Sequence, residues 1–438
     1  MFNAIDLSLI SRALQHRNYR LYCYGQGISL IGVWAQRVAV AWLVYRLTGS
    51  ALMLGVVGFL GDIPTVLAAP IAGVLADRWD RRRLIMVVQS LAMLQAAVLA
   101  ALVLTGAVAV WHIIALTLFS GLLTAFEVPT RQSYIVELIE RREDLGNAVA
   151  LNSSLVNGAR LVGPSIAGIL IATVGEGICF LLNAISYVAV IGCFVAMKVK
   201  PWQRTDKGEP LFRELQQGFA YVFGFPPMRS ILLLLGLISL MGVPFQVLMP
   251  VFAKDILHGG ASVLGFLMGC SGAGAFLGAI YLASRKNVLG LERLIPVATG
   301  IFGIGLIAFS LSRVLWLSLG LMILTGFGMI AQMASSNTML QALADDDKRG
   351  RVMSFYTIAY RGMYPIGSLL AGSLASKIGA PGTLLLGGVC CLVGGAWFAR
   401  QLPAMREAIH PIYARMGYVS AAGPAISPAS DARVSLEK

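Results

Sequence analysis

Long apolar stretches alternate with short polar segments along almost the whole chain. About 20 consecutive apolar residues span a bilayer core as a helix, because a helix satisfies its own backbone hydrogen bonds where water is absent. Twelve stretches of about that length can be read in the sequence. Their approximate limits are 21–45, 51–76, 84–104, 110–134, 148–173, 177–197, 230–253, 261–284, 294–312, 315–341, 353–376 and 380–399. The sequence therefore predicts an all-α membrane protein with twelve transmembrane helices.

The composition supports a membrane protein and argues against catalysis. Hydrophobic residues make up 57% of the chain and charged residues 13%, whereas soluble domains average about 25% charged residues. The six cysteines and four histidines show no metal-ligand spacing, and the sequence contains neither a nucleophile motif nor a Walker-type phosphate loop. We therefore expect no enzymatic activity, no cofactor and no metal.

The basic residues set the expected orientation. With the N-terminus inside the cell, most of the 34 Lys and Arg residues fall in cytoplasmic segments, as the positive-inside rule requires. The segment before the first stretch lacks an apolar core, so it is not a signal peptide. We expect a multi-pass protein of the inner (cytoplasmic) membrane with both termini in the cytoplasm. The formal charge of +13 then faces anionic lipid, so the expected partner is the bilayer and not nucleic acid.

A polar interruption after the sixth stretch divides the chain into two halves. The expected units are a first six-helix bundle, a cytoplasmic linker, a second six-helix bundle and a partly disordered cytoplasmic tail, over residues 1–197, 198–229, 230–400 and 401–438. Within the linker, apolar residues recur at helical spacing between Leu211 and Phe223. This pattern predicts an amphipathic helix on the inner membrane surface.

The two halves resemble each other in sequence. A shift of 204 residues superposes small and apolar residues of the fifth and eleventh stretches, namely Gly163, Ala167, Gly168 and Leu170 on Gly367, Ala371, Gly372 and Leu374. A shift of 205 residues superposes Gly73 and Arg81 on Gly278 and Lys286. Two matches at nearly the same offset indicate two pseudo-symmetric bundles related by a parallel repeat.

A charged turn joins the second and third stretches. Its pattern, Gly-x-x-x-Asp-Arg-x-x-Arg-Arg, resembles the signature loop at this place in the major facilitator superfamily, a group of single-chain secondary transporters. Positive-inside charge alone would account for the arginines but not for the glycine or the acid. The resemblance implies the major facilitator fold, a substrate site between the two bundles and a gating role for this loop. Its key residues are Gly73, Asp77, Arg78, Arg81 and Arg82.

The fifth stretch carries a second motif. It resembles the Gly-Pro motif of antiporters in the same superfamily, with Gly158, Gly163, Pro164 and Gly168 in matching places. Ordinary close packing of helices is the alternative interpretation, because small residues allow two helices to approach.

Further runs extend the resemblance over most of the chain. The runs 34–39, 47–51, 129–132, 152–168 and 180–187 are similar to the drug-exporter branch that includes the enterobactin exporter. That branch implies proton-driven export of drugs or siderophores. The arginine motif that many drug antiporters carry in the fourth helix is missing here in its usual form, so no proton-coupling arginine can be assigned from those relatives.

Six charged residues lie inside the apolar stretches. A charge at the bilayer centre costs about 2.5 to 3.5 kcal/mol on insertion scales, so such residues usually face a water-filled cavity and have partners. Asp62 and Glu127 are the candidates for proton coupling, because a carboxylate can take up and release a proton. The candidate charge partners or substrate-binding residues are Arg37, Arg131, Arg160 and Arg361, together with Gln332 and Asn337 of the tenth stretch.

Two of these assignments have structural alternatives. Glu127 and Arg131 are four residues apart on one helix face, where a local ion pair is the alternative to a coupling role. Gln332 and Asn337 belong to a polar stripe that either binds substrate or forms hydrogen bonds between helices.

The sequence as a whole predicts a proton-coupled antiporter that exports a drug-like compound or a siderophore by alternating access. Its expected partners are that small molecule and protons. Each chain holds a complete set of spans and could act alone as a monomer, and the sequence leaves the oligomeric state open. Two alternatives stay open, namely an importer or lipid flippase of the same fold, and a transport-inactive membrane protein that senses or binds a ligand.

Overall fold

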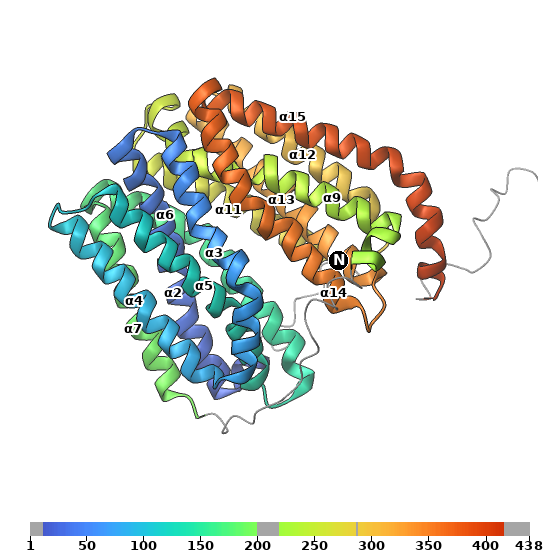
Figure 1. Cartoon of the computed structure of the whole chain (residues 1–438), viewed down its shortest axis with the longest axis horizontal. Coiled ribbons are helices and arrows are strands. Elements are labelled where there is room, and N and C mark those ends of the chain that lie inside the picture. The colour runs from blue at the N-terminus through green and yellow to red at the C-terminus, as the bar shows by residue number, and fades with distance from the viewer. Residues whose placement is uncertain (1–11, 199–218, 286–287, 416–438) are drawn as a thin grey trace, which may run out of the picture.

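The computed structural model describes residues 12–198, 219–285 and 288–415 (Figure 1). Within these residues all regular secondary structure is helical. Eleven continuous helical segments are long and apolar enough to cross a membrane. The predicted all-α membrane fold is confirmed.

The first half contains six long helices that follow the first six predicted spans. They are α2 (Arg17–Thr48), α3 (Ala51–Arg78), α4 (Arg81–Leu104), α5 (Val110–Leu138), α6 (Leu145–Val174) and α7 (Glu176–Ala196). Single-turn helices η1 (Arg12–Gln15) and η2 (Arg142–Asp144) precede α2 and α6. Gly49 ends α2 in the left-handed conformation at φ 58°, and the Ser50 side chain caps the start of α3.

The second half is less regular. Its elements are α9 (Pro226–Met241), η3 (Val243–Leu248), α10 (Met249–Val251), η4 (Phe252–Ile256), α11 (Ala261–Ala283), α12 (Leu291–Leu311), α13 (Leu315–Leu343), α14 (Arg349–Thr357), η5 (Ile358–Gly362) and α15 (Met363–Arg415). The first four form one crossing, which Pro244 and Pro250 interrupt by removing backbone donors. Both η4 and η5 are π-helical turns.

The final helical segment crosses the membrane twice. It runs from Arg349 to Ala414 over 66 residues, which is about 100 Å of helix against a bilayer core of about 30 Å. Gly379 breaks it with φ 76° and ψ 161°. The eleven continuous segments therefore provide the twelve predicted crossings.

The charged turn between the second and third spans is shorter than the sequence suggested. Helix α3 continues to Arg78 and α4 begins at Arg81, so Trp79 and Asp80 alone connect the two helices. The Asp80 side chain accepts a hydrogen bond from the backbone N of Arg83 at 3.1 Å and so caps α4. The predicted loop residues Gly73 and Asp77 lie in the last turns of α3 instead, because the helix continues past Pro70 and Gly73 and ends only at Arg78.

The helices form two bundles that lie side by side in Figure 1. In the first, α2 packs against α6 and α7, α3 against α5, and α4 against α5 and α7. In the second, α13 packs against α11 and α12, and α15 against α9 and α12. The main contacts between the bundles are α6 with α11 and α3 with α15.

At both of these main contacts two helices cross with a glycine on each side, and we call these contacts glycine crossings. A Cβ atom added to Gly55 of α3 would lie 2.9 Å from the Cα of Gly372 in α15, and one added to Gly168 of α6 would lie 2.7 Å from the Cα of Gly265 in α11. A larger residue at either crossing would push the helices apart. Gly168 and Gly372 are the residues that the repeat superposes, so the two bundles use equivalent glycines to approach each other.

The two ends of the bundles differ. The four glycines lie toward the connections at 49–50, 175, 257–260 and 379, which we call the closed end. The opposite end, which we call the termini end, carries residues 12–16, 79–80, 139–144 and 344–348. In Figure 1 the bundles diverge from the crossings toward the termini end.

The linker and the tail are described only in part. A short helix covers residues 219–224, whereas most of the predicted amphipathic helix from Leu211 to Phe223 lies outside the described residues. Helix α15 continues beyond the last predicted span, through Pro403 and Pro411, to Arg415. The tail from residue 416 onward lies outside the described residues.

Candidate functional site

A cavity of about 320 Å³ lies between the two bundles. Its walls come from α2, α3, α5 and α6 of the first bundle and from η3, η5 and α15 of the second. A second pocket of about 220 Å³ adjoins it and shares Trp34, Arg37 and Asp62 as wall residues. Together they form a polar space in the interior of an apolar molecule.

All six charges predicted from the spans line this one cavity. They come from five different elements: Arg37, Asp62, Glu127, Arg131, Arg160 and Arg361. Their positions in the sequence span more than 300 residues, so the fold alone brings them together. The gathering explains how the chain tolerates charges in membrane-spanning segments, since each side chain faces a polar space.

Trp34 organises two of the arginines. It precedes Arg37 by one helical turn on α2, and the Arg37 guanidinium carbon lies 5.2 Å from the centre of its ring. The Arg160 guanidinium carbon, from α6, lies 5.6 Å from the same ring. These distances are typical of cation–π contacts. Gly163 makes the arrangement possible, because a Cβ there would lie 2.6 Å from the Trp34 Cβ.

Asp62 lies between cations from both bundles. It interacts electrostatically with Arg37 of α2 and with Arg361 of η5. Neither arginine forms an ion pair with Asp62 within 4.0 Å among the described residues. The Asp62 carboxylate therefore attracts Arg37 and Arg361 over a longer distance, and this attraction acts between the two halves of the molecule.

Glu127 and Arg131 do not form the local ion pair that their spacing allows. Within the described part of the chain, no N to O distance between them falls within 4.0 Å. The Nη1 atom of Arg131 is buried and has no hydrogen-bond partner there. Both side chains line the cavity instead. Their spacing places them on the same face of α5, but it does not determine the rotamers that would bring the two charged groups together.

Among the described residues, no carboxylate oxygen lies within 4.0 Å of the Arg160 side-chain nitrogens. Its Nη2 atom lies 4.0 Å from the Sδ atom of Met329, and its electrostatic neighbours are Tyr360, Tyr364 and Arg37. Two of these neighbours are neutral phenols, and the third carries the same charge as Arg160. Arg160 is thus a cation in the middle of the fold that the described protein groups do not neutralise.

The polar stripe of the tenth span does not reach the cavity. Gln332 is completely buried and donates from Nε2 to the Ser336 Oγ at 3.1 Å. Asn337 accepts a hydrogen bond from Gln341 at 2.6 Å. Neither lines a cavity wall, and both hydrogen bonds lie within α13, so substrate binding by this stripe stays a prediction.

The sequence analysis missed several wall residues. Tyr360, Tyr364 and Gln246 complete the second-bundle side of the cavity. Tyr360 and Arg361 are adjacent in sequence and both reach the cavity from the π-helical turn η5, a local distortion that often marks functional sites. The available signal was an aromatic residue close to a charge inside a span, directly before Arg361 for Tyr360 and one helical turn before Arg37 for Trp34.

The residues of the predicted gating loop tie the first bundle together. Arg81 Nη1 donates to Glu137 Oε1 at 2.6 Å, joining α4 to α5. Arg82 donates to the carbonyl oxygens of Phe194 at 2.8 Å and Val195 at 3.1 Å, at the end of α7. The side chains of Asp77 and Arg78 lie outside the described atoms.

The antiporter-like motif divides into packing and non-packing positions. Gly163 meets α2 at Trp34, and Gly168 meets α11 at Gly265. Gly158 has no neighbour within 4 Å of an added Cβ, and Pro164 lies inside α6. Close helix packing therefore accounts for two of the three glycines.

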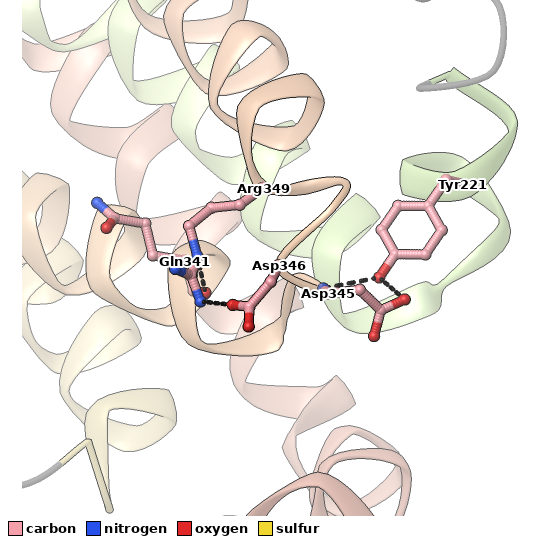
Figure 2. Close-up of polar contacts among 5 residues, drawn as sticks. All are labelled: Tyr221, Gln341, Asp345, Asp346 and Arg349. Carbon is pink, nitrogen blue, oxygen red and sulfur yellow. Dashed lines mark hydrogen bonds and ion pairs between the residues drawn. The ribbon is translucent and has the colours of Figure 1, made fainter.

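Polar contacts at the termini end attach the segment before each bundle to that bundle. His16 contacts Asp144 at 3.0 Å, between the start of α2 and the start of α6. Figure 2 shows the corresponding contact in the second half, where the Tyr221 hydroxyl donates to Asp345 Oδ2 at 3.0 Å. In the same loop Arg349 pairs with Asp346 at 2.7 Å. Burial is the main cause that raises the pKa of Tyr221.

Comparison with known proteins gives consistent matches over most of the chain. Residues 12–416 match the family model described as transmembrane secretion effector. The chain is 27% identical to the staphyloferrin A transporter of Staphylococcus aureus (strain NCTC 8325 / PS 47) over 364 residues, which cover 82% of this chain and 90% of the relative. It is 26% identical to the multidrug efflux pump Tap of Mycolicibacterium fortuitum over 393 residues, covering 87% and 93%.

Solved structures share the fold. A bacterial homolog of the human lysosomal transporter Spinster, in an inward-facing and unoccupied conformation, superposes with a TM-score of 0.72. The match covers 90% of this chain and 98% of that one at 12% sequence identity. At that identity the match concerns the fold alone.

Proposed function

The chain belongs to the transmembrane secretion effector family, a membrane transporter family of the major facilitator type, and from this membership we propose that it exports a small molecule in exchange for protons. The names of its relatives, a staphyloferrin A transporter and a multidrug efflux pump, support transport and favour the outward direction. We place it in the bacterial cytoplasmic membrane as a monomer, with both termini in the cytoplasm.

The observation that carries this proposal is the charged cavity between two bundles that meet at one end. A substrate in the cavity is enclosed by parts of both bundles, so a rocking motion of one bundle against the other would expose it to one side or the other. With the termini in the cytoplasm, the structure corresponds to the state that is open to the inside. The glycine crossings then form the outer closure.

Protonation of Asp62 supplies a reason for the two states to interconvert. The ionised carboxylate attracts Arg37 in its own bundle and Arg361 in the other. Once Asp62 is neutral, that attraction between bundles disappears and the two arginines repel each other. Proton binding can change a conformational equilibrium only by such a difference in interaction energy between the states. Glu127 is the second candidate for this role, since it lines the same cavity.

Efflux from proteoliposomes under an imposed pH gradient tests this mechanism. The probes are ethidium as a cationic drug and a catecholate siderophore. We expect Asp62→Asn to lose gradient-driven transport but to keep exchange down a substrate gradient, because the amide resembles the neutral acid and cannot release a proton. Glu127→Gln is the matched variant on the neighbouring carboxylate.

Each result has a distinct meaning. Loss of uphill transport in Glu127→Gln alone moves the proton site to Glu127. Uphill movement in the opposite direction identifies an importer, and movement of labelled lipid identifies a flippase. If the parent protein moves neither probe nor lipid, the transport proposal is wrong.

A further inference from the structure

The cavity carries more positive than negative charge. Its walls hold the guanidinium groups of four arginines and the carboxylates of two acids, Asp62 and Glu127. With both acids ionised, four positive charges minus two negative charges leave two in excess. Protonation of either acid during a transport cycle increases that excess to three.

The two acids are placed near particular arginines, and Arg160 is not one of them. Asp62 faces Arg37 and Arg361. Glu127 lies one helical turn from Arg131 on α5, and both act electrostatically on Tyr22. In the described part of the chain Arg160 forms no ion pair within 4.0 Å, and its main electrostatic neighbours are two tyrosines and Arg37. A poorly solvated cation without an opposite charge is costly, and a bound anion removes that cost.

The surroundings of Arg160 also define the body of such an anion. Trp34 lies beside the guanidinium at 5.6 Å, and Tyr360 and Tyr364 line the same cavity. Aromatic walls favour a ligand with a planar or apolar body. The guanidinium fork fits two neighbouring oxygen atoms, as found in a carboxylate or a deprotonated catechol.

We propose that the cavity binds a small organic anion with a planar or apolar body, whose paired oxygen atoms contact Arg160 beside Trp34. The proposal rests on the transport function above and names the substrate class of that same site. A cationic drug is disfavoured, because it would approach an uncompensated arginine while both acids already face other arginines.

Ligand-induced thermal stabilisation of the purified full chain in detergent tests the charge class directly, since a ligand that binds the folded state raises the melting temperature. The anionic probes are fluorescein, 2,3-dihydroxybenzoate and citrate. Rhodamine 123 is the matched cation, because it shares the planar ring system of fluorescein. We expect at least one anion to bind more tightly than rhodamine 123. Comparing the stabilisation by fluorescein and 2,3-dihydroxybenzoate, which are planar, with that by citrate, which is not, shows whether the site prefers a planar ligand.

Variants of Arg160 connect the binding to this residue. Arg160→Gln should weaken the binding of the preferred anion about tenfold or more, because a charge-assisted contact is lost, and Arg160→Lys should retain part of it. Arg83→Gln removes one positive charge from an exposed side chain outside the cavity and should leave the anion affinity unchanged. If Arg160→Gln fails to fold, Arg160→Lys carries the comparison.

The proposal is overturned if no anion stabilises the protein, if rhodamine 123 binds more tightly than every anion, or if the Arg160 variants bind anions like the parent. These outcomes are separable from a failure of the transport function. Anion binding without gradient-driven efflux would reject transport and keep the anion site. Gradient-driven efflux of cations alone would keep transport and reject the anion site.

Discussion

The two ends of the molecule hold their helices together by different means. At the closed end the bundles touch through backbone atoms, at Gly55 with Gly372 and at Gly168 with Gly265. At the termini end the ion pairs of the described residues join segments of the same bundle, as in His16 with Asp144 and Arg81 with Glu137. Arg46 with Glu176 is a similar pair within the first bundle at the closed end. The ends therefore differ in what lies between the bundles, which is backbone packing at the closed end, whereas the termini-end ion pairs of the described residues stay within one bundle.

The difference suits a molecule that must open one end and close the other. Glycine crossings carry no charge, so their separation breaks no ion pair and costs mainly lost van der Waals contact. Charged side chains at the termini end stay solvated while the bundles are apart and can form contacts across the gap when it closes. The closed end also has one polar contact between bundles, from the Tyr45 hydroxyl to Asp255, with Lys254 5.5 Å from the centre of the Tyr45 ring.

Enlarging a glycine crossing should have the largest effect. In Gly168→Val the new side chain overlaps Gly265, and overpacking of about 1 to 3 kcal/mol would shift the closed-end equilibrium about 5- to 150-fold toward separation. Spin-label distances across the closed end and efflux assays measure the shift. Gly192→Ala in α7, where nothing lies within 4 Å, is the control. Unchanged distances in Gly168→Val would show that shape does not hold this end.

Neutralising an acid at the termini end should have the next largest effect. Asp77 lies near the end of α3, and in this superfamily that acid can engage the positive start of the eleventh span, here the first turn of α14 at Arg349. We expect Asp77→Asn to reduce the population closed at the termini end and to slow efflux severalfold. Cysteine accessibility at the ends of α3 and α14 reports that population. Reduced transport with unchanged accessibility would reject the gating role and favour a role in folding.

Removing the Tyr45 contact between the bundles at the closed end should have a moderate effect. Tyr45→Phe deletes the hydroxyl that donates to Asp255, and we expect the closed end to lose about 1 to 2 kcal/mol, since the acceptor is charged. The spin-label pair used for the glycine variant would report a partial shift. Tyr24→Phe, on an exposed ring, controls for loss of a phenol. A shift as large as that of Gly168→Val would contradict the dominance of shape at this end.

The smallest effect is expected where the linker meets the second bundle. Tyr221→Phe removes the contact with Asp345 shown in Figure 2, and we expect at most about 1 kcal/mol of lost stability, because the site is partly exposed. Limited proteolysis of the linker and the melting temperature measure this change. Asp346→Asn, on a nearby exposed acid, serves as the control. A loss of transport in Tyr221→Phe with normal stability would assign this contact to the conformational cycle instead.

Much of the site could be predicted from the sequence because of one energetic constraint. A charge inside an apolar span must reach water or a partner, and all six such residues, from Arg37 to Arg361, line the cavity. Amides and hydroxyls obey a weaker constraint, since a neighbouring helix can satisfy them equally well. Gln332 therefore resembled a site residue in the sequence, although its side chain is buried among helices.

The sequence by itself determined the spans, their number and the repeat, because these follow from the length of apolar stretches and from local spacing along the chain. It also marked Gly168 and Gly372 as equivalent positions. Only the tertiary structure decided that Asp62 faces arginines of both bundles and that Arg160 has no ion pair within 4.0 Å among the described residues. Such pairings depend on how each helix is rotated and where it crosses its neighbours, and packing of the whole molecule sets both.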